Sequence, residues 1–429
     1  MERVGGGKFS GARPEVRQRL SGGLQGRMLR CRNMKILILA PFLPYPLDQG
    51  GKIRIFNIIK HLSKQHEVTL AAVVDDRSAA KPGELQDLCA EIVLVERPAR
   101  LWPDRLAFFT SRAPYNVIRY GSGAMRRALR QLQQRKNFDL IQIEFTMMWQ
   151  YADLFPATPV VLDAHNIEHK NVQQIGSSAT SPLWRLMYLI EEKRLRAVEE
   201  RAWRESALCF AVSENERDEI AARAGGSAKA ITAANGVDPE RFAFRPREQA
   251  GKRILFLGGM DYSPNLDAAR YFIREVLPII RGEEPEARVL LVGRELGRLG
   301  EDASLPGVEC HESVPEVLPW FYRADLLAVA LRQGAGTRIK VLEAFAAGLP
   351  VVATSKGCEG IGAENGRELL IADTPEQFAA AALRILKNPE TGRSLAQSAR
   401  SLVVERYTWE SAAKIMERSY GKLSGDHSL

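Results

Sequence analysis

Short apolar runs alternate with longer amphipathic segments along most of the chain, a pattern typical of parallel α/β proteins. In the first half, the predicted strands are Lys35–Ala40, Val68–Val74, Ile92–Val95, Leu140–Ile143, Val160–Asp163 and Leu208–Val212. A second series of strands is predicted at Arg253–Leu257, Arg288–Val292, Leu326–Ala330, Val351–Thr354 and Leu369–Ile371. Turn-forming residues cluster between the two series. The pattern predicts two doubly wound, Rossmann-like domains, 34–235 and 236–406, with ligands bound in the cleft beyond the carboxyl ends of the strands.

A glycine-rich loop that runs into a helix is the most informative local pattern. Gly334 and Gly336 precede Thr337, which is a suitable N-cap. Gly348, followed by Pro350, is a typical end of a helix. The sequence therefore predicts a helix that starts at a glycine-rich loop near the carboxyl edge of the second sheet.

Two basic residues, Arg338 and Lys340, fall in the first turn of this helix. Cations are unfavourable there, because the N-terminus of a helix already carries partial positive charge. A bound phosphate or diphosphate would remove the conflict, since loop amides, helix dipole and both cations would converge on it. Glu343 lies one turn beyond Lys340, where it would hold a sugar hydroxyl. The alternative is that these are solvated charges and an ordinary helix ion pair.

The first half of the chain contains a similar arrangement. Its first strand leads through two glycines into a helix whose first turn is again basic. The GxGxxG fingerprint of dinucleotide-binding proteins is missing, so NAD is not expected. One basic helix start in each half predicts a phosphate-bearing ligand held between the domains. The glycines that allow close approach of a ligand are Gly50, Gly51, Gly258 and Gly259, and the basic residues of the first half are Lys52 and Arg54.

His165 follows a strand that is expected to be buried, at the position where functional groups gather in this architecture. Asp163, Asn166 and Glu168 crowd the same turn, which favours a role in binding or in acid–base chemistry near neutral pH. A histidine that only caps the strand is the alternative. His169 lies nearby, but no third ligand is evident, so a metal is not expected.

The chain carries 60 Lys and Arg residues against 52 Asp and Glu residues, a formal net charge of +8 over 429 residues. Residues 1–33 are rich in Arg and Gly and lack apolar periodicity, so we expect a disordered basic tail or a start assigned too far upstream. Between Arg97 and Lys136, arginines alternate with aromatic residues, which favours a surface that lies against anionic lipid. Amphipathic helices with solvated arginines explain the same pattern. Without a nucleic-acid-binding motif, no nucleic acid is expected as a partner.

The segment from Arg185 to Arg204 is long and charged, which predicts a solvent-facing helix that covers the first sheet. No apolar run approaches the length of a membrane-spanning helix. The five cysteines are scattered and form no CxxC pair, so we expect reduced thiols rather than disulfides or zinc. A cytoplasmic protein with peripheral contact to the inner face of the cell membrane is the resulting expectation.

These motifs together resemble the retaining glycosyltransferases of sequence family four, which have the GT-B fold. The similarity extends from Met34 to about Tyr420. The residues that carry it are Gly50-Gly51, Asp163-Ala164-His165-Asn166, Val212-Ser213-Glu214, Asn235-Gly236-Val237-Asp238 and the block from Gly336 to Val352. The resemblance implies a nucleotide-diphosphate sugar bound mainly by the second domain, without a metal, and a final helix, 407–429, that packs back on the first domain.

The resemblance also implies roles for particular residues. Glu343 matches the second glutamate of the family's paired-glutamate motif and would hold the ribose, whereas the first glutamate falls on Ala335. Many relatives bind the diphosphate through an Arg and a Lys after the first strand of the second domain, where this chain has glycines. Arg338 and Lys340 are therefore expected to take over that role, and His165 is expected to lie near the transferred sugar.

The hypothesis is a hexosyltransferase that moves a sugar from a nucleotide donor to a glycan or lipid-linked acceptor with retention, in polysaccharide or glycoconjugate biosynthesis. Gly336 and Thr337 complete the expected donor site. The expected acceptor side consists of Asp163, Asn166, Lys52 and Arg54. Two other functions remain open: a nucleotide-sugar epimerase of the same fold, and a catalytically silent nucleotide-sugar-binding protein.

Overall fold

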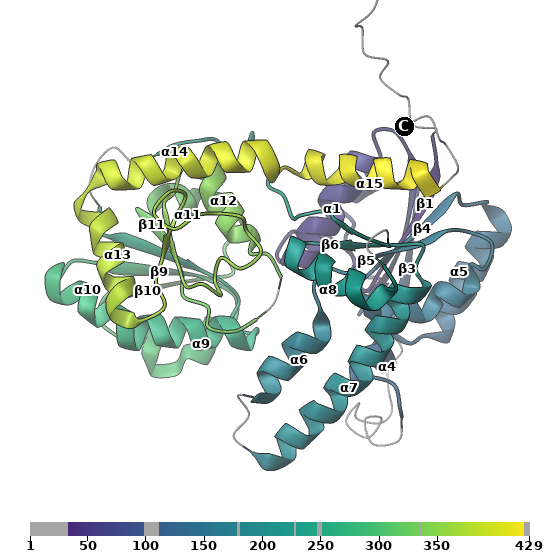
Figure 1. The fold of residues 1–429 in the computed structure, drawn as a ribbon, viewed down its shortest axis with the longest axis horizontal. Helices are drawn as coiled ribbons and strands as arrows, with labels where there is room; N and C mark the ends of the chain where they lie inside the picture. The colour runs from purple at the N-terminus through teal and green to yellow at the C-terminus, as the bar shows by residue number, and fades with distance from the viewer. Residues whose placement is uncertain are drawn as a thin grey trace, which may run out of the picture.

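A computed structural model of the chain describes residues 33–97, 111–177, 181–226, 229–246, 251–334 and 336–423. The expectations for the basic tail before residue 33, for residues 98–110 of the basic stretch and for Ala335 lie outside these ranges. In the described part, two parallel sheets flanked by helices form two Rossmann-like domains (Figure 1). The predicted doubly wound α/β architecture is confirmed.

The first sheet has seven parallel strands among the described residues, in the order β3-β2-β1-β4-β5-β6-β7. In chain order they are β1 (Lys35–Ala40), β2 (Glu67–Val74), β3 (Glu91–Glu96), β4 (Leu140–Glu144), β5 (Val160–Asp163), β6 (Leu208–Ala211) and β7 (Ala230–Thr232). Successive side chains of β1 enter different cores, Leu37 and Leu39 on one face and Ile36 and Ile38 on the other. Both faces of the sheet are therefore covered, which explains why its strands read as near-continuous apolar runs.

The helices of this domain occupy the connections between its strands. They are α1 (Gly50–Leu62), α2 (Leu85–Leu88), α4 (Tyr115–Tyr120), α5 (Gly123–Arg135), η1 (Thr146–Leu154), α6 (Glu168–Ser177), α7 (Pro182–Glu205) and α8 (Glu214–Ala224). The helices α6 and α7 pack on each other and project from the body of the domain as a hairpin (Figure 1). The prediction that 185–204 covers the sheet as a solvent-facing helix is wrong in part: Leu195 and Trp203 are buried, whereas the first turns of α7 stand away from the sheet.

The described part of the basic stretch forms α4 and α5. Met125, Leu129 and Leu132 of α5 are buried against the first sheet. Arg126 lies 2.8 Å from Asp153, and Arg135 lies 2.9 Å from Glu91. The packing of α5 therefore agrees with the alternative stated for the basic stretch, an amphipathic helix whose arginines lie at the surface.

The second sheet, within the described ranges, has six parallel strands in the order β10-β9-β8-β11-β12-β13. They are β8 (Arg253–Leu257), β9 (Arg288–Gly293), β10 (Val308–Glu312), β11 (Leu326–Val329), β12 (Val351–Ala353) and β13 (Leu370–Ile371). Its helical segments are α9 (Ser263–Tyr271), η3 (Phe272–Val276), α10 (Leu277–Glu283), η4 (Leu296–Ser304), α11 (Leu318–Arg323), α12 (Ile339–Ala347), α13 (Pro375–Lys387) and α14 (Pro389–Arg406). No helix among the residues with described placement is long and apolar enough to span a bilayer.

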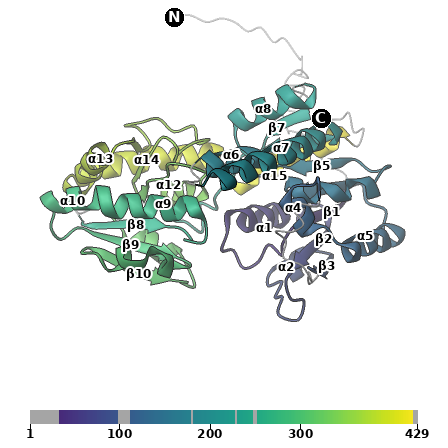
Figure 2. The ribbon, with the colours of Figure 1, turned by 90° about the horizontal axis from the view of Figure 1, so that it is seen from below.

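The chain crosses between the two domains twice at one place. The amide of Val237 donates to the carbonyl of Tyr407 at 2.9 Å. A Cβ atom on Gly236 would lie only 2.4 Å from the backbone nitrogen of Trp409, so only glycine fits where the two crossings touch. Helix α15 (Trp409–Leu423) then continues from α14 onto the first domain, as Figures 1 and 2 show. The side chains that it adds to the core beside α1 are Ala412, Ala413, Met416 and Tyr420.

Candidate active site

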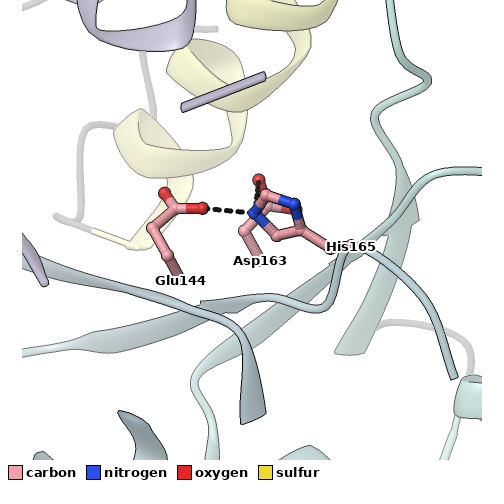
Figure 3. Close-up of side chains that lie close together, drawn as sticks. All are labelled: Glu144, Asp163 and His165. Atoms are coloured by element: carbon pink, nitrogen blue, oxygen red, sulfur yellow. Dashed lines mark hydrogen bonds and ion pairs between the residues drawn. The ribbon is translucent and has the colours of Figure 1, made fainter. Parts of the chain in front are cut away.

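Two neighbouring strands of the first sheet end in acidic residues that face the same histidine. Glu144 ends β4 and Asp163 ends β5, and the strand register places them side by side. His165 follows two residues later with a φ of 47°, in the left-handed region that residues other than glycine rarely adopt. The three side chains point toward one another (Figure 3), with His165 Nε2 2.7 Å from Glu144 Oε2 and 3.8 Å from Asp163 Oδ2.

Aromatic packing fixes the plane of the His165 ring. Phe145 stacks on it, with ring centroids 3.8 Å apart and an interplanar angle of 16°. Gly51 lies on the far side of Phe145: a Cβ atom at Gly51 would be 2.9 Å from the Phe145 ring. The small residue at position 51 therefore makes room for the aromatic ring that supports His165, while Gly50 faces Ile339 of the second domain at 3.6 Å.

Arg54 holds Asp163 in place below this cluster. Its Nε and one terminal nitrogen donate to the two carboxylate oxygens at 2.8 and 2.9 Å, and the other terminal nitrogen donates to Asn235 at 3.1 Å. Burial by itself lowers the pKa of Arg54, but the charge and hydrogen bonds of Asp163 outweigh burial and raise it. The structure corrects the acceptor-side assignment of Arg54 and Asp163, because both are buried and bonded to each other rather than turned to the cleft.

Glu144 links His165, through Gln142, to Tyr420 on α15. Gln142 donates to the second oxygen of Glu144 at 2.5 Å, and the hydroxyl of Tyr420 on α15 donates to the oxygen of Gln142. Burial raises the pKa of Glu144, and the neighbouring charge of Asp163 raises it further. Sequence reasoning missed Glu144, although a glutamate directly after a buried strand, one strand away from the His165 turn, was the signal that would have found it.

Glu144, Asp163 and His165 offer three ligand atoms within 4.8 Å of one another, the spacing of a metal site. Their contacts do not fit one. His165 and Glu144 are in direct hydrogen-bond contact at 2.7 Å, and both oxygens of Asp163 already accept from a guanidinium cation. His169 bonds to Glu199 at 2.6 Å instead of facing His165. The donor set therefore forms a hydrogen-bonded network rather than a metal centre.

The glycine-rich loop of the second domain lies against the His165 turn. Gly336 has a φ of 81°, and its Cβ position is 3.6 Å from the carbonyl oxygen of His165 and 3.7 Å from Asn166. Arg338, rather than Thr337, occupies the N-cap position of α12. Thr337 instead donates its hydroxyl to the carbonyl of Val212 at 3.2 Å, because the loop folds over the first domain before the helix begins.

Three ionisable side chains with shifted pKa values meet at the start of α12. Lys340 donates to the carbonyl of Leu257, at the end of β8, at 2.6 Å. Burial and the nearby charge of Arg338 lower the pKa of Lys340 to about 7. Burial likewise lowers the pKa of Arg338 and raises that of Glu343 to about 7. Such a concentration of perturbed groups is typical of functional sites.

The loop after β8 is held by its own polar side chains. Asn265 donates to the carbonyl of Gly259 at 3.0 Å, and its side chain would be 2.9 Å from a Cβ atom at Gly258. A Cβ atom at Gly259 would lie 2.3 Å from an oxygen of Asp261. A side chain at either position would have to displace Asn265 or Asp261, and both glycines follow Leu257, to whose carbonyl Lys340 donates.

A chain of ion pairs joins this loop to the first domain. Lys52 lies 2.8 Å from Asp48, and Asp48 lies 3.0 Å from Arg294, which also contacts Asp261 at 3.1 Å. Arg294 follows β9 and was not singled out from the sequence, although a basic residue directly after a predicted strand is a recognisable signal. The two domains thus meet through charged groups on both sides of the predicted phosphate site.

A groove that is partly open to solvent, with about 510 Å³ of space including that solvent, lies between the domains and is lined in part by the Gly336 loop. The first domain contributes Lys170 and Gln174 of α6 and Glu216 of α8, and the second contributes Thr337 and Glu359. Burial raises the pKa of Glu216 to about 7. Polar groups of both domains therefore surround a space next to the His165 turn, which is the arrangement that a second substrate requires.

Solved structures with the same arrangement of domains include glycosyltransferase-fold proteins with bound nucleotide. The Anabaena protein HepE in complex with UDP and glucose is 15% identical, with a TM-score of 0.64 over 91% of this chain and 100% of that one. Sucrose-phosphate synthase from Thermosynechococcus elongatus is 18% identical, with a TM-score of 0.66 over 92% of this chain and 100% of that one. These similarities define the fold as GT-B.

Two family models identify the class of enzyme. Residues 49–241 match the model described as Glycosyltransferase Family 4, and residues 251–388 match the model described as Glycosyl transferases group 1. The chain belongs to the family 4 glycosyltransferases, as the motifs predicted. A Klebsiella pneumoniae protein described as "Uncharacterized 44.6 kDa protein in cps region" is 21% identical over 391 residues, 87% of this chain and 96% of that protein.

Proposed function

We propose that the protein transfers a hexose from a nucleoside-diphosphate sugar to a glycan or lipid-linked acceptor, with retention of anomeric configuration. The observation that carries this proposal is the convergence of Arg338, Lys340 and Glu343 at the start of α12, beside the loop after β8. Two buried cations at a helix N-terminus suit a diphosphate, because each gains an anionic partner that compensates its lost hydration. The bound UDP of HepE supports a uridine nucleotide as the first donor to test.

In the proposed complex, the diphosphate lies between α12 and the N-terminus of α1. Lys340 and Arg338 neutralise the phosphates, and Glu343 binds the ribose hydroxyls. The glycosidic bond to the diphosphate breaks, its electron pair stays on the phosphate oxygen, and the sugar gains oxocarbenium character. Preorganised cations stabilise that leaving group without a metal.

His165 serves the sugar side of the reaction. Phe145 and Glu144 fix its plane and hold its Nε2 atom. With an ionised Glu144, His165 donates from Nε2, which leaves Nδ1 as an acceptor for a sugar hydroxyl. Arg54 and Asp163 act as positioning residues in this proposal, while Asn166 and the groove beside Gly336 receive the acceptor.

The acceptor and the cellular site are also part of the proposal. The relative from the cps region supports a role in polysaccharide assembly. A lipid-linked acceptor places the enzyme in the cytoplasm, at the inner face of the cell membrane as a peripheral protein.

The test begins with the donor. Sugar nucleotides of uridine and guanosine are screened for a rise in melting temperature, since a ligand that binds only the folded state stabilises it by mass action. Positive donors are then incubated with and without membrane lipid extract, and release of nucleoside diphosphate is followed. Donor-dependent release that requires the extract supports transfer. Isotope exchange at the sugar without any acceptor would instead indicate an epimerase, and binding without turnover would indicate a silent binding protein.

A further inference from the structure

The α6–α7 hairpin projects from the body of the domain (Figure 1), and the first turns of α7, at its far end, carry exposed apolar side chains. Within the described residues, the exposed large apolar side chains are few, and half of them fall in one stretch of α7. They are Leu183, Trp184, Leu186 and Leu189, with 65%, 47%, 54% and 51% of their surface exposed. We call these four residues the apolar tip. Contiguous exposed apolar groups of this size mark interaction sites in proteins.

The exposed charge at the apolar tip is positive. Arg185 is exposed between the four residues, and Lys193 is exposed two turns further along α7. The acidic residues of this part of α7 are turned inward: Glu191 accepts from the amide of Tyr115 at 2.7 Å, and Glu192 is buried. A helix that presents Trp and Leu together with cations suits the interface of an anionic bilayer, where the rings and aliphatic chains enter the headgroup region.

A second copy of the chain suits this surface less well. In a two-fold symmetric contact the same patch meets itself, so the exposed cations Arg185 and Lys193 of both copies would be brought close together, with no exposed acidic residue in the described segment 182–193 to offset them. The sign of the exposed charge therefore favours lipid over self-association.

Helix α6 connects the apolar tip to the candidate active site. It begins at Glu168, three residues after His165, and its ten residues span about 15 Å at the helical rise per residue. Along this length, Lys170 and Gln174 line the groove between the domains. Gln174 also accepts from the amide of Gly334 in the donor loop at 2.9 Å. A membrane that contacts the apolar tip would therefore lie close enough to the groove for the headgroup of a lipid-linked acceptor to enter it.

We propose that the apolar tip inserts into the interface of an anionic membrane and so brings a lipid-linked acceptor to the groove. The delivery of an acceptor to the groove rests on the proposed transferase function, whereas the lipid contact does not. The four residues take no part in donor binding, so the two proposals are tested separately.

The experiment is co-sedimentation of the full chain with vesicles of phosphatidylcholine, alone or mixed with phosphatidylglycerol. The wild type is expected to bind the mixed vesicles and to be released by salt. The variant Leu183→Ser/Trp184→Ser/Leu186→Ser is expected to bind at least about tenfold more weakly. Arg185→Glu is expected to weaken binding by about fivefold or more. Val404→Ser, which removes an equally exposed apolar side chain from α14, is the matched control and should bind like the wild type.

Wild-type protein that stays in the supernatant with phosphatidylglycerol vesicles would overturn the proposal, as would a triple variant that binds like the wild type. A wild-type dimer that the triple substitution converts to a monomer without lipid would assign the tip to self-association instead. The rise in melting temperature with UDP-glucose is measured in parallel. If no sample shows this rise in melting temperature, the result would count against the transferase function only, because the lipid contact is measured with the vesicles.

Discussion

The affinity for the donor should fall as the pH rises through 7, because the lysine proposed to bind the diphosphate loses its charge there. The pKa of Lys340 is lowered from 10.5 to about 7, with burial as the largest cause. A diphosphate beside the amine stabilises the charged form, so binding raises this pKa again. Each complex formed above pH 7 must then take up close to one proton, and linkage makes the dissociation constant rise about tenfold per pH unit. Because Lys340 is already about half deprotonated at pH 7, the affinity should fall by about 15-fold between pH 7 and 8.5.

Glu343 acts in the same direction. Its pKa is raised to about 7, chiefly by burial, so it becomes negative in the same range and repels the phosphates. The groups that face Lys340 are Arg338, Glu343 and the carbonyl of Leu257; beside burial, the charge of Arg338 lowers the pKa of Lys340 and that of Glu343 raises it. The fall in donor affinity with rising pH is therefore expected to come from the coupled titration of Lys340 and Glu343 at the start of α12.

Calorimetric titration with UDP-glucose from pH 6 to 8.5 at fixed ionic strength measures this effect, since the diphosphate of the intact sugar nucleotide does not titrate in that range. Lys340→Met should bind weakly and keep only the part of the slope that Glu343 causes, and Glu343→Gln should keep the part that Lys340 causes. A wild-type affinity that is constant from pH 6 to 8.5 would refute the reasoning. So would a Lys340→Met variant that retains the full slope.

Further substitutions test the site and the fold. Arg338→Ala and Lys340→Ala should each lower kcat by about a hundredfold or more with the fold kept, which turnover assays and circular dichroism check together. Glu144→Gln removes the charged partner of His165 and should lower kcat/KM and shift the pH dependence of turnover, whereas a merely structural loss would change the melting temperature alone. Glu343→Gln should reduce the loss of stability that the wild type shows between pH 4.5 and 7, because the raised pKa makes the folded state bind the proton more tightly, while Glu216 with its similarly raised pKa keeps part of that loss; identical melting curves for both proteins at pH 5 and 8 would contradict this. Gly236→Ala should destabilise the protein by several kcal/mol through backbone contact with Thr408 and Trp409, whereas Gly282→Ala, with nothing within 4 Å of its Cβ position, should be neutral or stabilising in thermal unfolding.

The alternation of apolar and amphipathic segments was sufficient to predict the two sheets, because buried parallel strands leave long apolar runs. It failed for β7 and β10, each of which lies at one edge of its sheet. Ala230–Thr232 is only three residues long, and Val308–Glu312 alternates apolar, acidic and polar residues because one side of it has no neighbouring strand. The opposite edge strands, β3 and β13, were predicted, because their short sequences are more apolar.

The sequence points to a candidate site where a function leaves a local pattern, as at Gly336, Arg338 and Lys340, and the donor role of these residues stays a prediction. It was not predictable where residues meet only through the fold. Glu144 reaches His165 because β4 and β5 are neighbours in the sheet, and Arg54 reaches Asp163 across 109 residues of sequence. The basic first turn of the helix in the first half suggested that Arg54 binds a ligand. In the structure, Arg54 is buried and donates to Asp163 instead.

The return of α15 to the first domain has an evolutionary consequence. Since the last helix of the chain supplies Met416 and Tyr420 to the core beside α1, the first domain is encoded in two separated pieces of the gene. A recombination event at the Gly236 crossover that replaced everything downstream would also replace that helix. A new donor specificity therefore has to arise by substitutions within the second domain, or by exchange of the segment between the two crossings while α15 is kept.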